Sequence, residues 1–358
     1  MSDSMNAVMC HAPHDYRYED VPIPHAEHGE IVIKVNACGV CASDIKCYTG
    51  APLFWGDDTR QPYVETPVIA GHEFIGEIVE IGHGAVENND LKVGDRAIAE
   101  QIVPCWECRY CKTGKYWLCQ VHNIFGFQTV VNGGMAEFMK FPADALVHKV
   151  PSDMPIENAA MIEPLACSIH AVQRGEIEFG DTVVIAGAGT LGLGMIGAAK
   201  LKNPGLLISI DLLPKRLEAA KKLGADITLN PSNTDVVQEI LDMTDGYGCD
   251  VYIEATGHPK AVEQGLHMIR KAGTFVEFSV MREPVTVDWT IIGDTKELNI
   301  HGSHLGPYTY PLAIDYIQKG LIDVSHIVTH QLQLKDYLTA FDMVKNGKDS
   351  IKVQLIPS

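Results

Sequence analysis

Four cysteines between residues 105 and 119 form the most specific chemical signal in the sequence. Cys105, Cys108, Cys111 and Cys119 follow the spacing Cys-x2-Cys-x2-Cys-x7-Cys. Four thiolates spaced in this way can close a tetrahedron around zinc and leave no open position, as a structural site requires. Such a site is a poor Lewis acid, because four negative ligands outweigh the charge of the ion. An iron–sulfur cluster takes the same ligands, but nothing else in the chain indicates electron transfer. Four free thiols are the remaining alternative.

A second motif, running from Gly187 to Gly192, matches the pattern Gly-x-Gly-x-x-Gly. An apolar strand is predicted before it and a helix after it, and Asp211 follows Gly192 by 19 residues. In dinucleotide-binding turns, glycines let the backbone approach the pyrophosphate, the helix N-terminus offers free N–H groups, and a carboxylate binds the ribose. An ordinary βα turn is the alternative. The candidate cofactor contacts in this motif are Gly187, Gly189, Thr190, Leu191 and Gly192.

Asp211 favours NAD over NADP as the cofactor, because its negative charge would repel a 2′-phosphate. Lys215 and Arg216 follow a few residues later and weaken this preference. On a helix these two cations can instead face solvent. Arg216 remains a candidate cofactor contact.

Three further segments carry side chains that could bind a metal or move a proton. A lone cysteine or histidine is more often a packing residue, and a lone serine is often a turn hydroxyl, so each segment is weak by itself. The side chains are Cys41, Ser43 and Asp44 in the first segment, His72 and Glu73 in the second, and Glu163 in the third.

The elements that must hold these residues fall into two patterns. Up to about residue 155, short alternating or apolar runs broken by Gly and Pro predict a β-rich, barrel-like domain. From about residue 156, apolar strands alternate with amphipathic helices, which indicates a doubly wound parallel sheet. After about residue 300 this alternation fades into a helix near 308–319 and a strand at 351–356. The predicted strands are 182–186, 206–210, 227–229, 251–255 and 274–279, with helices at 191–201, 215–223, 235–243 and 259–270.

Composition excludes several classes of protein. The chain has 358 residues, enough for two domains, and 28 Lys and Arg against 46 Asp and Glu give a formal charge of −18. This acidic balance argues against nucleic acid and anionic membranes as partners, since both require cations. The N-terminus lacks the pattern of a secretory signal, and the apolar run at 183–199 is glycine-rich and short for a bilayer span. We therefore expect a cytoplasmic protein with reduced cysteines.

Taken together, the motifs resemble the zinc-dependent medium-chain dehydrogenase/reductase family. The order is Cys-x-Ser-Asp, Gly-His-Glu, the four-cysteine lobe, Glu-Pro-Leu and then the glycine-rich turn, and the likeness covers nearly the whole chain. Within this family, the sequence is most similar to the polyol, or sorbitol-type, dehydrogenases. The resemblance implies an α/β protein with a GroES-like β-barrel catalytic domain over 1–155, a structural zinc lobe at about 100–120, a Rossmann domain over 156–300, and a return of 301–358 to the catalytic domain.

The resemblance also implies a second, catalytic zinc. Cys41 and His72 match its firm ligands, while Glu73 and Glu163 match positions that bind zinc directly or through water. With one carboxylate bound, the formal charge of the site is zero, whereas two carboxylates would make the zinc a weaker electrophile. We therefore expect Glu73 and Glu163 not to contribute equally to zinc binding throughout turnover. An open position would bind the substrate hydroxyl and stabilise its alkoxide during hydride transfer.

Further roles follow from the same resemblance. Ser43 matches the hydroxyl that takes the substrate proton, and Asp44 matches a residue that orients the metal ligands. Lys46 departs from the family pattern, because many members have a histidine there that continues the proton relay. The resemblance also implies cofactor contacts at three strand ends, by Thr256, Ser279 and Ser303. Ordinary strand-end turns are the alternative.

We expect an NAD-dependent zinc enzyme that oxidises a secondary hydroxyl of a linear polyol to a ketose. Erythritol and threitol are favoured over sorbitol and xylitol on overall resemblance. L-Threonine 3-dehydrogenase and butanediol dehydrogenase are alternative activities, and a non-catalytic zinc- and NAD-binding protein is an alternative class. The family also implies a homo-oligomer, a dimer or a tetramer.

One stretch bears on the choice of substrate. Cys41 and His72 are 31 positions apart, more than we expect from a sorbitol-type member. The stretch could wall the zinc cleft, or it could be an oligomer contact or a surface excursion. Its aromatic and charged residues are Phe54, Trp55, Asp57, Asp58, Arg60 and Tyr63.

Overall fold

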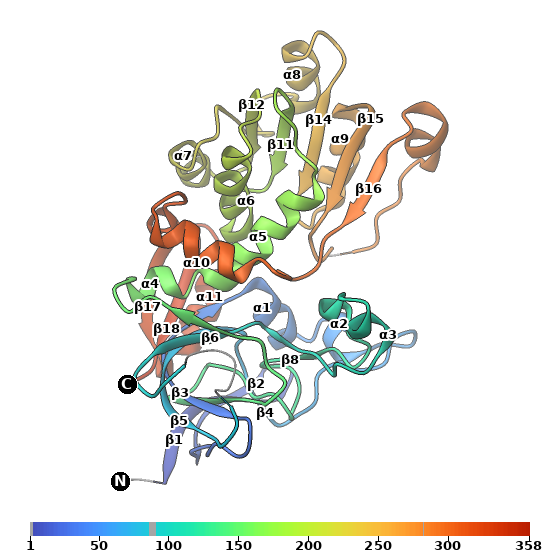
Figure 1. The fold of residues 1–358 in the computed structure, drawn as a ribbon. Coiled ribbons are helices and arrows are strands. Elements are labelled where there is room, and N and C mark those ends of the chain that lie inside the picture. The colour runs from blue at the N-terminus through green and yellow to red at the C-terminus, as the bar shows by residue number, and fades with distance from the viewer. Residues whose placement is uncertain (1–2, 86–90, 282) are drawn as a thin grey trace. The chain divides into compact units, whose positions relative to one another are not determined.

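The computed structural model describes residues 3–85, 91–281 and 283–358 (Figure 1). The chain divides into two compact units. The first consists of residues 1–163 and 328–358, and the second of residues 164–327. Residues 301–327 therefore belong to the second unit, whereas the resemblance implies the first domain for them.

The first unit is built around the long strand β3 (Ile31–Val40), of which eight of ten residues are buried. It pairs antiparallel with β5 (Glu73–Ile81) on one side and with the terminal strand β18 (Lys352–Ile356) on the other. The strand predicted at 351–356 is thus β18, and it lies beside β3 although more than 300 residues separate them. Strands β10, β6, β5, β3, β18 and β17 form one sheet in that order, with β9 also paired to β3.

The remaining elements of the first unit are short. A second sheet has the order β2, β1, β4, and a two-stranded sheet joins β7 and β8. The strands are β1 (Ser4–Ala12), β2 (Asp15–Pro22), β4 (Val68–Ile69), β6 (Arg96–Ala99), β7 (Ile102–Val103), β8 (Asn123–Ile124), β9 (Phe138–Phe141), β10 (Val147–Val150) and β17 (Val328–Gln333). The helices are α1 (Ala42–Tyr48), α2 (Pro52–Trp55), α3 (Arg109–Lys112), α4 (Ile156–Ala159) and α11 (Tyr337–Asn346), with single turns at Tyr116–Leu118 and Leu334–Asp336.

The second unit contains a six-stranded parallel sheet with the order β13, β12, β11, β14, β15, β16 (Figure 1). The order reverses between β11 and β14, so the predicted doubly wound sheet is confirmed. The strands are β11 (Thr182–Ala186), β12 (Leu206–Ile210), β13 (Ile227–Leu229), β14 (Cys249–Glu254), β15 (Ile269–Glu277) and β16 (Asn299–Gly302). The helices are α5 (Ile162–Arg174, which begins in the first unit), α6 (Thr190–Leu201), α7 (Pro214–Lys222), α8 (Val236–Met243), α9 (Pro259–Met268) and α10 (Tyr310–Gln318), with single turns at Ile291–Thr295 and Val324–His326.

The core of this unit explains why its elements form. β11 and β12 are apolar along almost their whole length and buried, as expected for inner strands covered on both faces. Helices α8 and α9 bury Ile240 and Leu266 in a cluster that also holds Tyr252 and Phe275, whose ring centroids are 5.1 Å apart. The helix predicted near 308–319 is α10, whereas the sequence pattern does not predict β16. β16 has only one large apolar side chain, Ile300, so periodicity does not reveal it.

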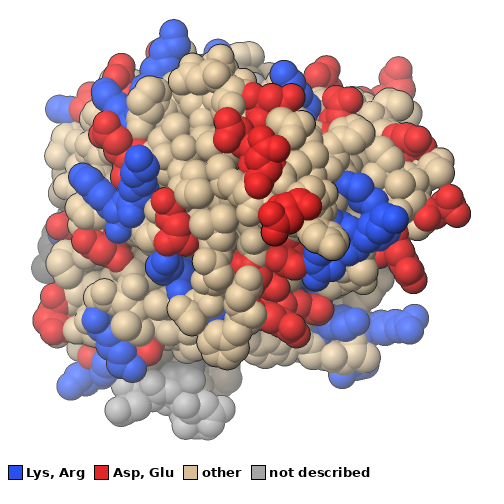
Figure 2. Space-filling view, turned by 90° about the horizontal axis from the view of Figure 1, so that it is seen from above, with Lys and Arg blue, Asp and Glu red and all other residues tan. Residues whose placement is uncertain are grey.

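Surface charge and helix length bear on the expected partners. On the face drawn in Figure 2, acidic and basic side chains intermingle, and no broad basic patch is visible among the described residues. Within the described part of the chain, no helix is long and apolar enough to cross a membrane. The apolar run at 183–199 instead supplies the inner strand β11 and the buried helix α6.

Candidate functional site

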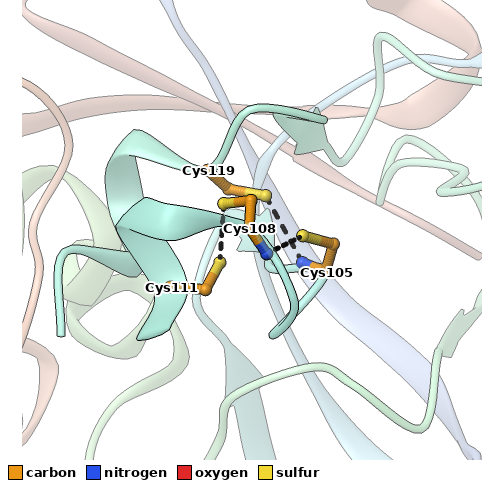
Figure 3. Close-up of side chains that lie close together, drawn as sticks. All are labelled: Cys105, Cys108, Cys111 and Cys119. Carbon is orange, nitrogen blue, oxygen red and sulfur yellow. Dashed lines mark hydrogen bonds between the residues drawn. The ribbon is translucent and has the colours of Figure 1, made fainter. Parts of the chain in front are cut away.

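The four clustered cysteines converge in a lobe of the first unit around α3 (Figure 3). Their sulfur atoms all lie within 4.8 Å of one another. Backbone N–H groups point at the sulfurs: the N–H of Cys105 donates to Cys119 Sγ, and that of Cys108 donates to Cys105 Sγ, each at 3.4 Å. The N–H of Gln120 donates to Cys108 Sγ at 3.5 Å.

These contacts suit thiolate ligands. Backbone N–H groups of Cys111 and Gln120 lower the pKa of Cys108 to about 6, so this thiol loses its proton readily. Among the described residues the donor set consists of four sulfurs, which fits a structural zinc ion. The structure therefore brings together the four cysteines that the sequence assigns to the structural zinc site.

A second group of possible ligands consists of Cys41, His72 and Glu73, whose ligand atoms also lie within 4.8 Å of one another. Cys41 follows β3 directly and caps α1, while Glu73 begins β5. Because β3 and β5 pair antiparallel, with Gly39 opposite Glu73, residues 32 positions apart in the chain meet at one end of the sheet. His72 is 5% and Glu73 2% exposed, whereas Cys41 is half-buried.

Two residues of α1 support this group. The Oδ2 atom of Asp44 accepts the backbone N–H of Cys41 at 2.8 Å, and its Oδ1 atom lies 3.4 Å from His72 Nδ1. Ser43 Oγ lies 3.4 Å from the other ring nitrogen, Nε2. Burial opposes a charged imidazole, but Asp44 and Cys41 more than offset this, so the pKa of His72 is raised. The pocket therefore favours a cation, and a carboxylate behind a histidine is typical of catalytic zinc sites.

The structure places the other two predicted residues less directly. Glu163, the second residue of α5, is 4% exposed but does not belong to the group of ligand atoms within 4.8 Å. Lys46 lies on α1, one turn after Ala42, and is half-buried. The places of Glu163 and Lys46 do not indicate a direct bond from either residue to a metal.

Sequence reasoning missed Lys352, which is 1% exposed and forms an ion pair with Glu73. Its ammonium group also donates to the backbone oxygen of Val40 at 3.1 Å. Lys352 and Glu73 are 279 residues apart in the chain. A single lysine in a short strand usually lies on the solvent face, so only the placement of β18 beside β3 could have revealed this contact.

Aromatic residues of the stretch between Cys41 and His72 pack on Phe127, which in turn contacts His72. The Phe127 ring lies 5.4 Å from that of His72 and stacks on Phe54 at 5.2 Å, with Tyr63 at 6.1 Å. Trp55 Nε1 donates to the backbone of α1 at Cys47. The charged residues, Asp57, Asp58 and Arg60, are exposed.

The predicted cofactor contacts of the second unit all follow the carboxyl ends of parallel strands. Gly187 comes after β11 with φ +99°, a left-handed conformation that favours glycine. A Cβ at Gly192 would collide with the backbone oxygen of Gly187, so this turn needs glycine there as well. Thr190 and Leu191 open α6, whose N-terminus lies at this edge.

Asp211 follows β12 and holds the glycine-rich turn. Its Oδ2 atom accepts the N–H of Ala188 and its Oδ1 atom that of Leu213, both at 2.8 Å. Arg216 Nη1 lies 3.9 Å from the same carboxylate, whereas Lys215 is exposed. Asp211 is thus positioned beside the glycine-rich turn, with Arg216 as its neighbour.

Thr256, Ser279 and Ser303 follow the ends of β14, β15 and β16, and therefore lie at the same edge of the sheet as the glycine-rich turn. Sequence reasoning missed Glu254, which is fully buried at the end of β14 and accepts hydrogen bonds from the backbone of Thr256 and Gly257. A carboxylate at the end of an apolar strand was the available signal.

Glu277 pairs in register with Glu254 on the adjacent strand. Burial and the charge of Glu254 raise the pKa of Glu277 to about 7 from 4.5. The folded state therefore prefers the protonated form. Protonated Glu277 therefore stabilises the folded state fully below about pH 4.5, and this stabilisation is lost as the pH rises through about 7.

We expect Glu277→Gln to stabilise the protein at pH 8 more than at pH 5, by on the order of 2 kcal/mol after allowing for partial exposure. Chemical unfolding of the NAD-free protein at both pH values measures this difference. Glu263→Gln, on the exposed side of α9, is the control. An equal change at both pH values would remove Glu277 as the titrating group.

Two family models match the chain. The model described as the alcohol dehydrogenase GroES-like domain matches residues 27–152, and the zinc-binding dehydrogenase model matches residues 190–319. Together they cover most of the chain and confirm the predicted fold class, a GroES-like domain with a Rossmann domain.

Individual proteins match over nearly the whole length. The chain is 52% identical to the erythritol/L-threitol dehydrogenase of Mycolicibacterium smegmatis, covering 99% of this chain and 98% of that protein. It is 34% identical to the sorbitol dehydrogenase of Bacillus subtilis with the same coverage. A solved alcohol dehydrogenase from Escherichia coli in complex with NADH is 28% identical, with a TM-score of 0.88 and coverage of 99% of this chain and 100% of that chain.

Proposed function

The chain belongs to the zinc-dependent medium-chain alcohol dehydrogenase family, and on this premise we propose that it oxidises a secondary hydroxyl of a short linear polyol to a ketose. Its cofactors are NAD and zinc. The sequence identity of 52% to an erythritol/L-threitol dehydrogenase supports a four-carbon polyol as substrate. It exceeds the 34% identity to a sorbitol dehydrogenase, whose substrate has six carbons.

The observation that carries this proposal is the contrast between the two groups of ligands. Four sulfurs close one site, whereas Cys41, His72 and Glu73 supply only three donors beside a serine hydroxyl. Bound zinc would supply a Lewis acid for an alkoxide, and NAD would accept the hydride. Asp44, which contacts Cys41 and His72, would orient both ligands, and Ser43, whose hydroxyl lies 3.4 Å from His72 Nε2, would take the proton of the substrate hydroxyl.

The experiment is a screen for NADH formation with zinc-replete protein. The substrates are erythritol, L- and D-threitol, xylitol, sorbitol, L-threonine and 2,3-butanediol. We expect the highest kcat/KM with erythritol or a threitol. A preference for threonine or butanediol would replace the polyol proposal, and no turnover with any substrate would favour the non-catalytic class.

The preference for NAD rests on Asp211. We expect Asp211→Gly to lower kcat/KM for NAD about 10- to 100-fold, because the ribose loses a charged acceptor worth ~1.5–3 kcal/mol. The loss with NADP should be smaller or absent, since Arg216 remains beside the turn. Steady-state kinetics with both cofactors measure the ratio, and Glu218→Gln on the exposed face of α7 is the control. An unchanged ratio would exclude Asp211 as the discriminating residue.

We also propose a homo-oligomer, a dimer or tetramer, that works in the cytoplasm. β16 is the edge strand of the parallel sheet in the second unit, and Ile300 on it is 43% exposed. Val280 and Trp289 of the same unit are 43% and 74% exposed. An edge strand and exposed apolar side chains favour association. Ten unbridged cysteines suit a reducing compartment. Light scattering during size-exclusion chromatography tests the oligomer, and a monomer would contradict it.

A further inference from the structure

The most unusual buried charge of the first unit is the ammonium group of Lys352. Lys352 is 1% exposed, and its partner Glu73 is 2% exposed. A buried ammonium without a counterion is very costly, so the pair cannot be an incidental surface contact.

The backbone is arranged to permit this contact. Strands β18, β3 and β5 are adjacent, and Gly39 on the middle strand lies opposite Gln354 on one side and Glu73 on the other. A Cβ at Gly39 would collide with both Lys352 Cε and Glu73 Oε2. The absence of a side chain at Gly39 therefore opens the path along which Lys352 crosses β3 to reach Glu73.

The contact places the lysine next to the catalytic ligands. Glu73 has an oxygen within 4.8 Å of the ligand atoms of Cys41 and His72, and Lys352 holds its Oε2 atom. A second hydrogen bond, from Lys352 Nζ to Val40 at 3.1 Å, fixes the ammonium group beside the residue that precedes Cys41. The negative charge of Glu73 is thus neutralised by the protein itself.

We propose that Lys352 is a positioning residue that retains Glu73 and keeps it from becoming a permanent ligand of the catalytic zinc, so that a coordination position stays open for the substrate. This proposal rests on the proposed function of the same site. Zinc, the Cys41 thiolate and the carboxylates of Glu73 and Glu163 sum to −1, and Lys352 brings the sum to zero. The lysine therefore maintains both the open position and the electrophilic character of the metal.

The test uses Lys352→Met, Lys352→Arg and the double variant Lys352→Met/Glu73→Gln in the full-length protein. Cobalt(II) is exchanged into the catalytic site while the four-cysteine site keeps zinc. Visible absorption then reports coordination number independently of activity, since five-coordinate cobalt(II) absorbs more weakly than four-coordinate cobalt(II). Metal content, kcat and KM are measured in parallel.

We expect Lys352→Met to weaken the cobalt bands, because Glu73 is released to the metal, and to raise KM for the best polyol about tenfold. Lys352→Arg should restore the strong bands. The double variant should restore them too, since it removes the competing carboxylate. This variant also buries no unpaired charge, so it tests the proposal even where the single variant does not fold.

Unchanged bands in Lys352→Met, or weak bands in the double variant, would overturn the role of Lys352. Failure of the proposed function is separate. In that case the wild-type protein turns over no polyol, while the cobalt spectra of the variants still report whether Lys352 governs the binding of Glu73 to the metal.

Discussion

Replacing Cys41 with alanine is expected to abolish polyol oxidation and to remove about half of the bound zinc. The group around Cys41 holds one sulfur, so its loss leaves one histidine and a carboxylate that is paired with Lys352. A Lewis acid contributes several kcal/mol to stabilising an alkoxide, which corresponds to a rate loss on the order of 10⁴-fold. NADH formation and elemental analysis of zinc measure the two effects.

The matched control is Cys249→Ala, which removes a fully buried thiol of β14 that belongs to neither group of ligands. This variant should keep its full zinc content and most of its turnover. Wild-type turnover in Cys41→Ala would show that the three-ligand group is not the catalytic centre. Loss of zinc from both sites would show instead that the substitution disrupts the whole unit.

Replacing Cys108 with serine is expected to have the second largest effect, on stability rather than on chemistry. Structural zinc binding is coupled to folding, and three sulfurs hold the ion far less tightly than four. We expect loss of one zinc ion and a fall in the apparent Tm on the order of 10 °C, since a loss of several kcal/mol shifts Tm by a few degrees for each kcal/mol. Differential scanning calorimetry and zinc analysis measure both.

The control for this variant is Lys112→Ser, an exposed position in the same short helix α3. It should leave zinc content and Tm unchanged. The kcat of the folded fraction of Cys108→Ser should stay close to wild type, because the closed site offers no position to a substrate. Full zinc content with an unaltered Tm would argue against a structural metal in this lobe.

The fold was largely predictable because its strongest signals are local. The strands at residues 182–186, 206–210 and 227–229 are observed with the predicted bounds. Buried parallel strands are continuous apolar runs, and such runs are visible in any window of the sequence. The weaker elements were missed for the same reason. β17 alternates half-buried and exposed residues, and β16 is short and polar, so neither carries a clear pattern.

The sequence by itself determined the closed cysteine cluster and the glycine-rich turn. Their residues lie within 15 and six positions, so short-range backbone geometry suffices to bring them together. It also indicated Cys41, His72 and Glu73, but only through their order along the chain and not through any local constraint.

Only the tertiary structure decided which charges meet at the three-ligand group. It set Lys352 against Glu73 across 279 residues, and it left Glu163 outside the closest donors. The physical reason is that strand pairing between β18, β3 and β5 depends on how the whole unit buries its apolar surface. No local pattern encodes which strands become neighbours, yet that adjacency gives a buried lysine its partner.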